Sequence, residues 1–140
     1  MDHLSREQRS RNMAAVRGKD TKPEKLVRSA LHRSGFRYSL HRRDLPGKPD
    51  LVLPKYKTVV FVHGCFWHGH ECPRGKKPAT RKQFWNKKLN QNRLRDQKSI
   101  AALEVMGWNV FVVWECSLEA GIDKVLRVLA AKRANASKAA

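Results

Sequence analysis

The sequence has few acidic residues and no long hydrophobic run. Its 140 residues include 12 Asp and Glu against 30 Lys and Arg, which leaves a net charge of +18 and a pI near 10.6. A membrane-spanning helix needs about 20 mostly apolar residues in a row, and no run approaches that length. The N-terminal segment also lacks the apolar core of a signal peptide. We therefore expect a soluble intracellular protein that binds a polyanion, with nucleic acid favoured over an anionic membrane.

The length of the chain excludes a second catalytic domain. A chain of 140 residues can bury one hydrophobic core but not two. Hydrophobic residues make up 41% of the sequence, so the protein also differs from disordered basic tails. We expect one domain over residues 19–133, preceded by a helix or arm over residues 1–18 and followed by a disordered tail over residues 134–140.

Half of the net charge lies in one segment. Residues 74–98 contain ten Lys and Arg and a single acid, Asp96, whereas residues 101–140 contain five basic and four acidic residues. A run of charge is usually a solvated surface, but an excess of one sign beside an aromatic residue such as Trp85 favours nucleic-acid binding. We therefore expect the segment 74–98 to contact phosphates.

Cysteine is scarce, and three cysteines cannot form a complete set of disulfides. Two of them lie in the segment 63–72, which contains five candidate metal ligands besides Glu71: His63, Cys65, His68, His70 and Cys72. The third, Cys116, follows the apolar run 110–114. Three Cys and one His are a common ligand set for structural zinc, although the spacing does not select the ligating histidine. The alternative is three buried thiols with scattered surface histidines.

The hydrophobic pattern predicts an α/β fold. Ser5 with Gln8, and Thr21 with Glu24, have the spacing of capping boxes that begin helices. The expected elements are helices over 5–16, 21–34, 84–106 and 118–131, and strands over 36–40, 50–53, 58–62 and 108–114. In the helix over 21–34, the expected core face consists of Leu26, Val27, Ala30 and Leu31. A hairpin turn at 55–56 and a right-handed crossover between the last two strands give a mixed sheet flanked by helices.

Asp50 is a candidate magnesium ligand at the start of the second strand. A carboxylate at a strand end, beside a strand that ends at His63, suits Mg²⁺ because this ion prefers oxygen ligands and keeps water in its shell. An Asp after Pro is more often a turn residue. Glu24 and His68, a candidate general base, favour the functional interpretation.

Several motifs together resemble one protein family. They are LPGKPD (45–50), HGCFWH (63–68), the His70-x-Cys72 pair, PATR (78–81), Phe84-Trp85, and the segment from Gly107-Trp108 to VWEC (113–116). These motifs resemble the very short patch repair (Vsr) endonucleases, which nick DNA at T:G mismatches left by deamination of 5-methylcytosine. The resemblance covers roughly residues 5–118.

The resemblance implies a fold, two metal sites and a set of catalytic residues. The fold would be that of type II restriction endonucleases, with a mixed sheet and a structural zinc site. The implied Zn²⁺ ligands are Cys65, His70, Cys72 and Cys116. The implied Mg²⁺ ligands are Asp50 and the backbone carbonyl of Val62. His68 would be the general base, and Glu24 and Asp96 would organise the metal-bound water.

The resemblance also implies how DNA is held. Phe66, Trp67 and Trp85 would wedge into the duplex from the major groove, while Met13 and Val16 would lie in the minor groove. Wedges part base steps, and the cost is smallest at a mismatch, which agrees with the proposed substrate. The alternatives are that Trp67 is a core residue and that the helix with Met13 and Val16 packs on the domain. Trp108 and Trp114 flank a buried strand, and we expect both in the core.

One feature departs from the restriction-endonuclease pattern, which places an acid, one residue and a lysine on the strand after Pro-Asp. The strand 58–63 contains neither acid nor lysine. The role of the lysine would pass to His68 or His63. His63 has two alternative roles: it forms a hydrogen bond to the scissile phosphate, or it supports the loop.

The resulting hypothesis is a strand-specific, Mg²⁺-dependent DNA endonuclease that cleaves 5′ to the mispaired T and starts very short patch repair. It would act as a monomer on double-stranded DNA in the bacterial cytoplasm, associated with the nucleoid, with mismatch-repair proteins and a DNA polymerase as further partners. The alternatives are a non-catalytic zinc-containing DNA-binding module and an RNA-binding protein.

Overall fold

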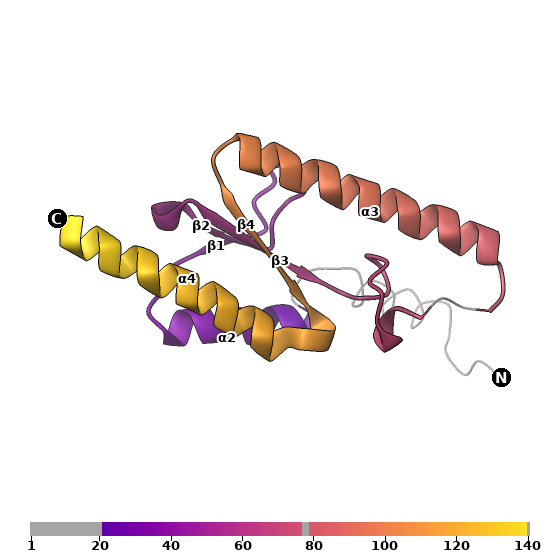
Figure 1. Ribbon diagram of the computed structural model, residues 1–140, viewed down its shortest axis with the longest axis horizontal. Helices are drawn as coiled ribbons and strands as arrows, with labels where there is room; N and C mark the ends of the chain where they lie inside the picture. Colours follow the sequence, from indigo (N-terminus) through magenta and orange to yellow (C-terminus); the bar gives the residue numbers. More distant parts are fainter. Residues whose placement is uncertain (1–20, 77–78, 140) are drawn as a thin grey trace.

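The computed structural model describes residues 21–76 and 79–139 (Figure 1). The predicted N-terminal helix, with Met13 and Val16, lies outside the described residues. The chain forms one sheet in the order β1-β2-β3-β4, in which β1–β2 and β2–β3 pair antiparallel and β3–β4 pair parallel. The strands are β1 (Ser39–Leu40), β2 (Leu51–Leu53), β3 (Thr58–His63) and β4 (Asn109–Trp114). The predicted mixed sheet is confirmed.

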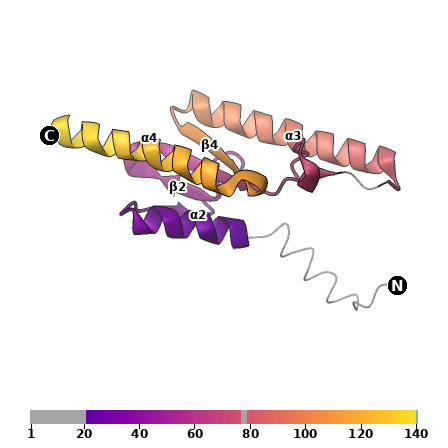
Figure 2. The same cartoon turned by 60° about the horizontal axis from the view of Figure 1, so that its bottom comes forward.

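Helices cover both faces of the sheet. Helices α2 (Lys22–Arg33) and α4 (Leu118–Ala139) lie on one face, and α3 (Lys82–Val105) lies on the other (Figure 2). The core under α2 and α4 consists of Val27, Leu31, Phe36, Leu51, Leu53, Val60, Val113, Val125 and Leu129. The core under α3 consists of Leu45, Val52, Val59, Phe61, Leu103 and Trp108. Neighbouring side chains of β2 and β3 divide between the two cores because they point to opposite faces.

Helix α2 begins where the sequence predicts. The Thr21 hydroxyl accepts a hydrogen bond from the Glu24 N–H at 3.4 Å, and Pro23 occupies the first turn. The inward stripe of this helix is Glu24, Val27 and Leu31. Leu26 was expected in the core but is 45% exposed, because residues three and four apart share a helix face and Leu26 lies one position off this stripe. Because Glu24 belongs to this stripe, its carboxylate points into the protein, and Glu24 is only 2% exposed.

Strand β1 is shorter than predicted. Only Ser39 and Leu40 pair with β2, and both are exposed. Phe36 is buried instead against Tyr56, with an edge-to-face ring contact at 5.7 Å. The alternation of apolar and polar residues over 36–40 therefore does not correspond to one strand. Its first part is a buried connection, and its last part is an edge strand.

The hairpin and the crossover follow the predicted scheme. Strands β2 and β3 join through a 3₁₀ turn (Pro54–Tyr56), and Lys57 then adopts a left-handed φ of +50°. Helix α3 connects the parallel strands β3 and β4. It ends before Gly107, whose φ of +90° suits glycine.

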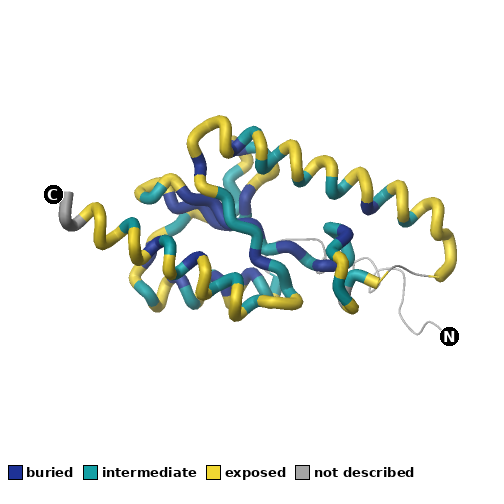
Figure 3. The backbone as a smooth tube through the Cα atoms, in the orientation of Figure 1, coloured by how far each residue is buried: buried dark blue, intermediate teal, exposed yellow. Residues whose placement is uncertain are grey.

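Helix α3 is long and mostly polar. Of its 24 residues, Leu89 and Leu103 are buried. Its C-terminal half packs on the sheet, whereas its N-terminal half extends past the sheet beside the segment that follows β3 (Figures 1 and 3). This extension brings residues from α3 to the end of the sheet where the predicted site residues lie.

Helix α4 extends to Ala139, so the end predicted near Ala131 is too early. The added segment is rich in alanine, the residue with the highest helix propensity. The helix thus passes through residues 134–139, for which a disordered tail was expected. Among the described residues, no helix combines the length and the apolar composition needed to cross a membrane.

Candidate active site and metal-binding loop

A cavity of about 750 Å³ lies at the end of the sheet where β3 leads into residues 64–76. Its walls come from the first turn of α2, the segment before β2, the end of β3 and the middle of α3. The side chains predicted to be catalytic all line it: Glu24, Asp50, His63, His68 and Asp96. Three cationic residues line it as well: Lys22, Lys48 and Arg95. The cavity therefore combines candidate metal ligands and a candidate base with positive charge that suits an anionic substrate.

Asp50 bridges the first residues of β2 and the end of β3. Its Oδ2 accepts a hydrogen bond from the Val62 N–H at 2.7 Å. Burial raises the pKa of Asp50 to about 6, the hydrogen bond from Val62 opposes this rise, and the nearby Glu24 carboxylate adds to it. A cation at this position would favour the ionised carboxylate. The buried environment is therefore consistent with a metal ligand.

Glu24 contacts one guanidinium group and one imidazole. Its Oε2 lies 3.2 Å from Arg28, and its Oε1 forms a hydrogen bond with Nε2 of His41. His41 lies in none of the sequence motifs and was not predicted as a site residue. Antiparallel pairing of the strands around 36–40 and 50–53, as the structure has it, places the residue after the first strand opposite Asp50.

His68, on the loop after β3, is held by Asp96 of α3. The Nδ1 atom of His68 lies 2.6 Å from Oδ2 of Asp96. If Nδ1 carries the proton and donates it to the carboxylate, Nε2 is left as the acceptor. The pair has the geometry of a histidine base oriented by a carboxylate.

His63 is buried beneath His68. The two rings stack with centroids 3.7 Å apart and planes 2° apart, and His63 is 5% exposed. Burial, together with the neighbouring His68, lowers the pKa of His63 to about 3, so the ring is neutral at pH 7. Among the described residues, its Nδ1 has no hydrogen-bond partner. The stacking supports the ring of His68, and the unpaired Nδ1 of His63 is itself buried.

A second group of ligands lies on the loop after β3. Candidate ligand atoms of Cys65, His70, Cys72 and Cys116 all lie within 4.8 Å of one another. His70 Nδ1 lies 3.5 Å from the Cys116 sulfur, and the His70 ring stacks on Trp114 at 4.0 Å. All three cysteines are free thiols. The structure therefore brings together the three Cys and one His that suit a tetrahedral metal ion, and it selects His70 where the spacing could not.

The thiols differ in how readily they ionise. Burial raises the pKa of Cys65 to about 12. Burial also acts to raise the pKa of Cys72, but hydrogen bonds from His70 and Cys65 outweigh it and lower that pKa to about 7. Metal ions bind thiolates, so a bound cation would supply the charge that stabilises them, above all at the buried Cys65.

Glycines allow the loop to close around these ligands. A Cβ atom at Gly75 would lie 2.0 Å from the backbone oxygen of His70. Gly69, with a φ of +63°, provides the turn before His70. The Cys65 N–H also donates to Glu115 at 3.0 Å, which joins the loop to the residue before Cys116. The donor set and its close backbone packing fit a small cation.

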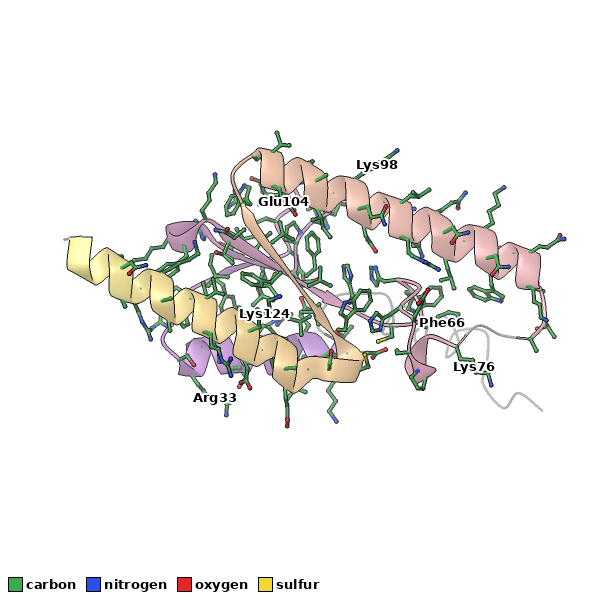
Figure 4. The ribbon with its side chains drawn as sticks, in the orientation of Figure 1. Arg33, Phe66, Lys76, Lys98, Glu104 and Lys124 are labelled. Atoms are coloured by element: carbon green, nitrogen blue, oxygen red, sulfur yellow. The ribbon has the colours of Figure 1, made fainter. Side chains whose placement is uncertain are left out.

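The three predicted DNA wedges form one aromatic cluster beside the cavity. The ring centroid of Phe66 lies 5.0 Å from that of Trp67 and 5.1 Å from that of Trp85. The Asn92 amide of α3 donates to the Trp67 backbone oxygen at 2.8 Å. In the described chain, neither hydrophobic core includes Trp67, which argues against the alternative that it is a core residue. Phe66 lies on the loop at the end of the sheet that α3 overhangs (Figure 4).

The two remaining tryptophans differ. Trp108 is 8% exposed and packs in the core under α3, as predicted. Trp114 was expected in the core, but it is half-buried and contacts histidines: its ring stacks on His70 and meets the His63 ring edge at 5.2 Å. The prediction for Trp114 is wrong because the end of β4 lies beside the loop after β3. Trp114 therefore contacts both the His70 ring and the stacked rings of His63 and His68.

The chain is similar to known DNA-cleaving proteins. A family model described as DNA mismatch endonuclease Vsr matches residues 1–74. The type II nicking enzyme V.XorIIP of Xanthomonas oryzae is 55% identical over 117 residues, which cover 84% of this chain and 86% of that protein. The type II nicking enzyme V.NmeAIP of Neisseria meningitidis is 48% identical over 118 residues, 84% of each chain. The DNA mismatch endonuclease Vsr of Escherichia coli is 46% identical over 110 residues, 79% of this chain and 70% of that protein.

Proposed function

The chain belongs to the Vsr family of DNA mismatch endonucleases, and we propose that it nicks one strand of duplex DNA 5′ to the mispaired T of a T:G pair. The observation that carries this proposal is the cavity that joins Asp50 and Glu24 to the His68–Asp96 pair. The aromatic cluster of Phe66, Trp67 and Trp85 lies beside the same cavity. The proposed reaction starts very short patch repair of deaminated 5-methylcytosine.

Asp50, with the backbone carbonyl of Val62, would hold Mg²⁺. The choice of ion follows from donor chemistry, because carboxylate and carbonyl oxygens are the ligands that Mg²⁺ prefers. Bound there, Mg²⁺ would neutralise charge on the phosphate and on the leaving oxygen. The buried carboxylate of Glu24 and the half-buried carboxylate of Asp50 support a cation at this position.

His68 acts as the general base. Its Nε2 accepts a proton from the water that attacks phosphorus in line with the leaving oxygen. Asp96 holds the Nδ1–H and stabilises the charge that develops on the ring. Glu24 orients the attacking water, and the neutral His63 supports the ring of His68 from beneath.

Cys65, His70, Cys72 and Cys116 would hold a structural Zn²⁺. The three-thiol, one-imidazole set and its spacing support this ion. In this proposal the zinc fixes the loop that carries Phe66 and Trp67. The protein would also have the fold of type II restriction endonucleases, to which the mixed sheet with helices on both faces is suited.

Mismatch selection follows from the aromatic cluster. Inserting Phe66, Trp67 and Trp85 into a base step requires unstacking, which costs least where the pair is already weak. The arm over residues 1–18, with Met13 and Val16, would grip the minor groove as the domain 19–133 grips the major groove. Mismatch-repair proteins and a DNA polymerase would follow the nick made by the monomeric enzyme in the cytoplasm.

The test uses end-labelled duplexes with a single central pair. T:G, C:G, T:A and abasic pairs are incubated with the protein in several methylation contexts, with either Mg²⁺ or EDTA. We expect an Mg²⁺-dependent nick 5′ to the T of T:G alone, which is lost in Asp50→Ala while DNA binding is kept. Binding without a nick in any T:G context would favour a non-catalytic DNA-binding module, and preferred binding of RNA would favour an RNA-binding protein.

A further inference from the structure

His41 lies directly opposite Asp50 at the edge of the sheet. The strand register pairs Ser39 with Val52 and Leu40 with Leu51. The His41 N–H continues this ladder and donates to the Asp50 backbone oxygen at 3.1 Å. The backbone thus fixes His41 beside a carboxylate of the proposed magnesium site.

The side chain of His41 faces the cavity carboxylates. His41 has a φ of +49°, a left-handed conformation that few residues other than glycine adopt. Its imidazole forms a hydrogen bond with Oε1 of Glu24, and the side chain is 16% exposed. An unusual backbone conformation next to a functional site is a reason to look for a function.

The three side chains have the spacing of ligands around one ion. Candidate ligand atoms of Glu24, His41 and Asp50 all lie within 4.8 Å of one another. Ligands at about 2.1 Å from an octahedral ion lie about 3 to 4.2 Å apart, so small movements suffice. The second carboxylate oxygens are engaged elsewhere: Oδ2 of Asp50 binds the Val62 N–H, and Oε2 of Glu24 binds Arg28. Oε1 of Glu24 holds the imidazole of His41, so a cation bound among the three side chains would replace this hydrogen bond.

We propose that His41 is the third side-chain ligand of the catalytic cation, which Asp50 and Glu24 also bind directly. This inference rests on the proposed function and adds to it the metal preference of the site. Imidazole suits first-row transition ions better than it suits Mg²⁺, which favours oxygen. A site of two carboxylates and one imidazole therefore takes Mn²⁺ more tightly than Mg²⁺ and uses it as a cofactor for nicking.

The test measures direct nitrogen coordination in the full-length, zinc-loaded protein. Mn²⁺ is added below one equivalent, and electron spin echo envelope modulation detects coupling to ¹⁴N. We expect the coupling in the native protein, a changed pattern when the histidines carry ¹⁵N, and loss of the coupling in His41→Gln. The Gln side chain retains a hydrogen-bond donor for Glu24. If His41 only positions Glu24, the metal spectrum of His41→Gln will therefore equal that of the native protein.

Affinities give a second measurement. His41→Gln should weaken Mn²⁺ binding about tenfold and Mg²⁺ binding less than about threefold. His68→Gln is the matched control, because it removes the other accessible imidazole of the cavity and should retain the ¹⁴N coupling. Isotope labelling of the native chain keeps the test valid even where a variant does not fold.

The outcomes separate this inference from the proposed function. Absence of ¹⁴N coupling in the native protein, or its persistence in His41→Gln, overturns the role of His41, and nicking at T:G would then still stand. Coupling that depends on His41, in a protein that nicks no T:G duplex, supports the ligand and refutes the proposed substrate.

Discussion

The Nδ1 atom of His68 lies 2.6 Å from Oδ2 of Asp96 and thereby connects the loop after β3 to the middle of α3. The two residues are 28 positions apart, and only the overhang of α3 brings them together. The sequence resemblance assigned Asp96 to the organisation of metal-bound water. The hydrogen bond supports a different role, in which Asp96 fixes the tautomer and the orientation of His68.

Replacement of Asp96 by Asn should slow the chemical step without weakening DNA binding. The amide group does not stabilise a protonated His68 and can favour the wrong tautomer, so we expect the single-turnover nicking rate to fall about 100-fold to 10,000-fold. Single-turnover kinetics on a T:G duplex and a gel-shift titration measure the two properties. A nicking rate within threefold of the native enzyme would contradict the proposed role.

Ionisation of Asp50 should make the protein less stable as the pH rises. In the absence of added Mg²⁺, burial raises the pKa of Asp50 from 3.8 to about 6. Between about pH 4 and 6, the folded protein therefore binds more protons at Asp50 than the unfolded chain does. The contribution of Asp50 to the free energy of unfolding falls as the pH rises through this window and stays constant above it. Asp50→Asn removes this penalty and should be about 1–3 kcal/mol more stable at pH 7.

The measurement is the difference in unfolding free energy between the native protein and Asp50→Asn from pH 4 to 7, with zinc bound. A difference is needed because the lowered pKa of His63 acts in the opposite direction: its folded form binds fewer protons than the unfolded chain between about pH 3 and 6.5. Asp123→Asn, at an exposed site on α4, is the matched control. A difference that does not change with pH would show that the surroundings of Asp50 do not raise its pKa.

Local signals explain why much of the fold could be predicted. The capping pair Thr21 and Glu24, the hairpin around Lys55 and the apolar segments of β3 and β4 each determine their own element, and the parallel pairing follows from the crossover. Predictions failed where a neighbour decides the outcome. Leu26 is exposed because α2 turns Val27 and Leu31 inward, and Trp114 contacts His70 because a distant loop packs against the end of β4.

The candidate site likewise contains residues that motifs predict and residues that only the tertiary structure brings together. Motifs identified Asp50, His68 and the cysteines, but the choice of His70 depends on turns at Gly69 and Gly75 that spacing does not reveal. His41 belongs to no motif, and its position follows only from the exact register of β1 on β2.

Addition of one methyl group at Gly75 should disrupt the loop that carries Cys65, His70 and Cys72. In Gly75→Ala, the Cβ would meet the His70 backbone oxygen at 2.0 Å and the Cys65 backbone oxygen at 3.3 Å. The backbone must then move and separate the ligands, so we expect zinc content to fall below half an equivalent and the melting temperature to drop. Gly64→Ala is the control, because its Cβ would lie 3.9 Å from the nearest neighbour, Glu115. Equal zinc content in the two variants would contradict the packing of the loop.

Cys116→Ser should remove zinc although Cys116 is 44 positions from the next cysteine. A serine hydroxyl does not replace a thiolate as a zinc ligand at neutral pH, and zinc sites of this type contribute directly to folding. Metal analysis of the purified protein and a thermal melt measure the loss. Glu71→Gln is the control, since Glu71 is exposed and lies outside the four-ligand group. Retention of one equivalent of zinc in Cys116→Ser would show that the ligand set is wrong.

Replacement of Trp85 by Ala should reduce discrimination more than overall affinity. Trp85 joins the cluster from α3, with its ring 5.1 Å from Phe66 and 6.1 Å from Trp67, whereas the surrounding charge of segment 74–98 attracts any duplex. A stacking aromatic contributes about 1–3 kcal/mol, so we expect T:G binding to weaken about 5-fold to 150-fold and T:A binding to change less than threefold. Arg95→Ala offers the opposite comparison, because loss of a phosphate contact should weaken both duplexes equally and lower the salt dependence. The same loss for T:G and T:A in Trp85→Ala would show that Trp85 contacts DNA without selecting the mismatch.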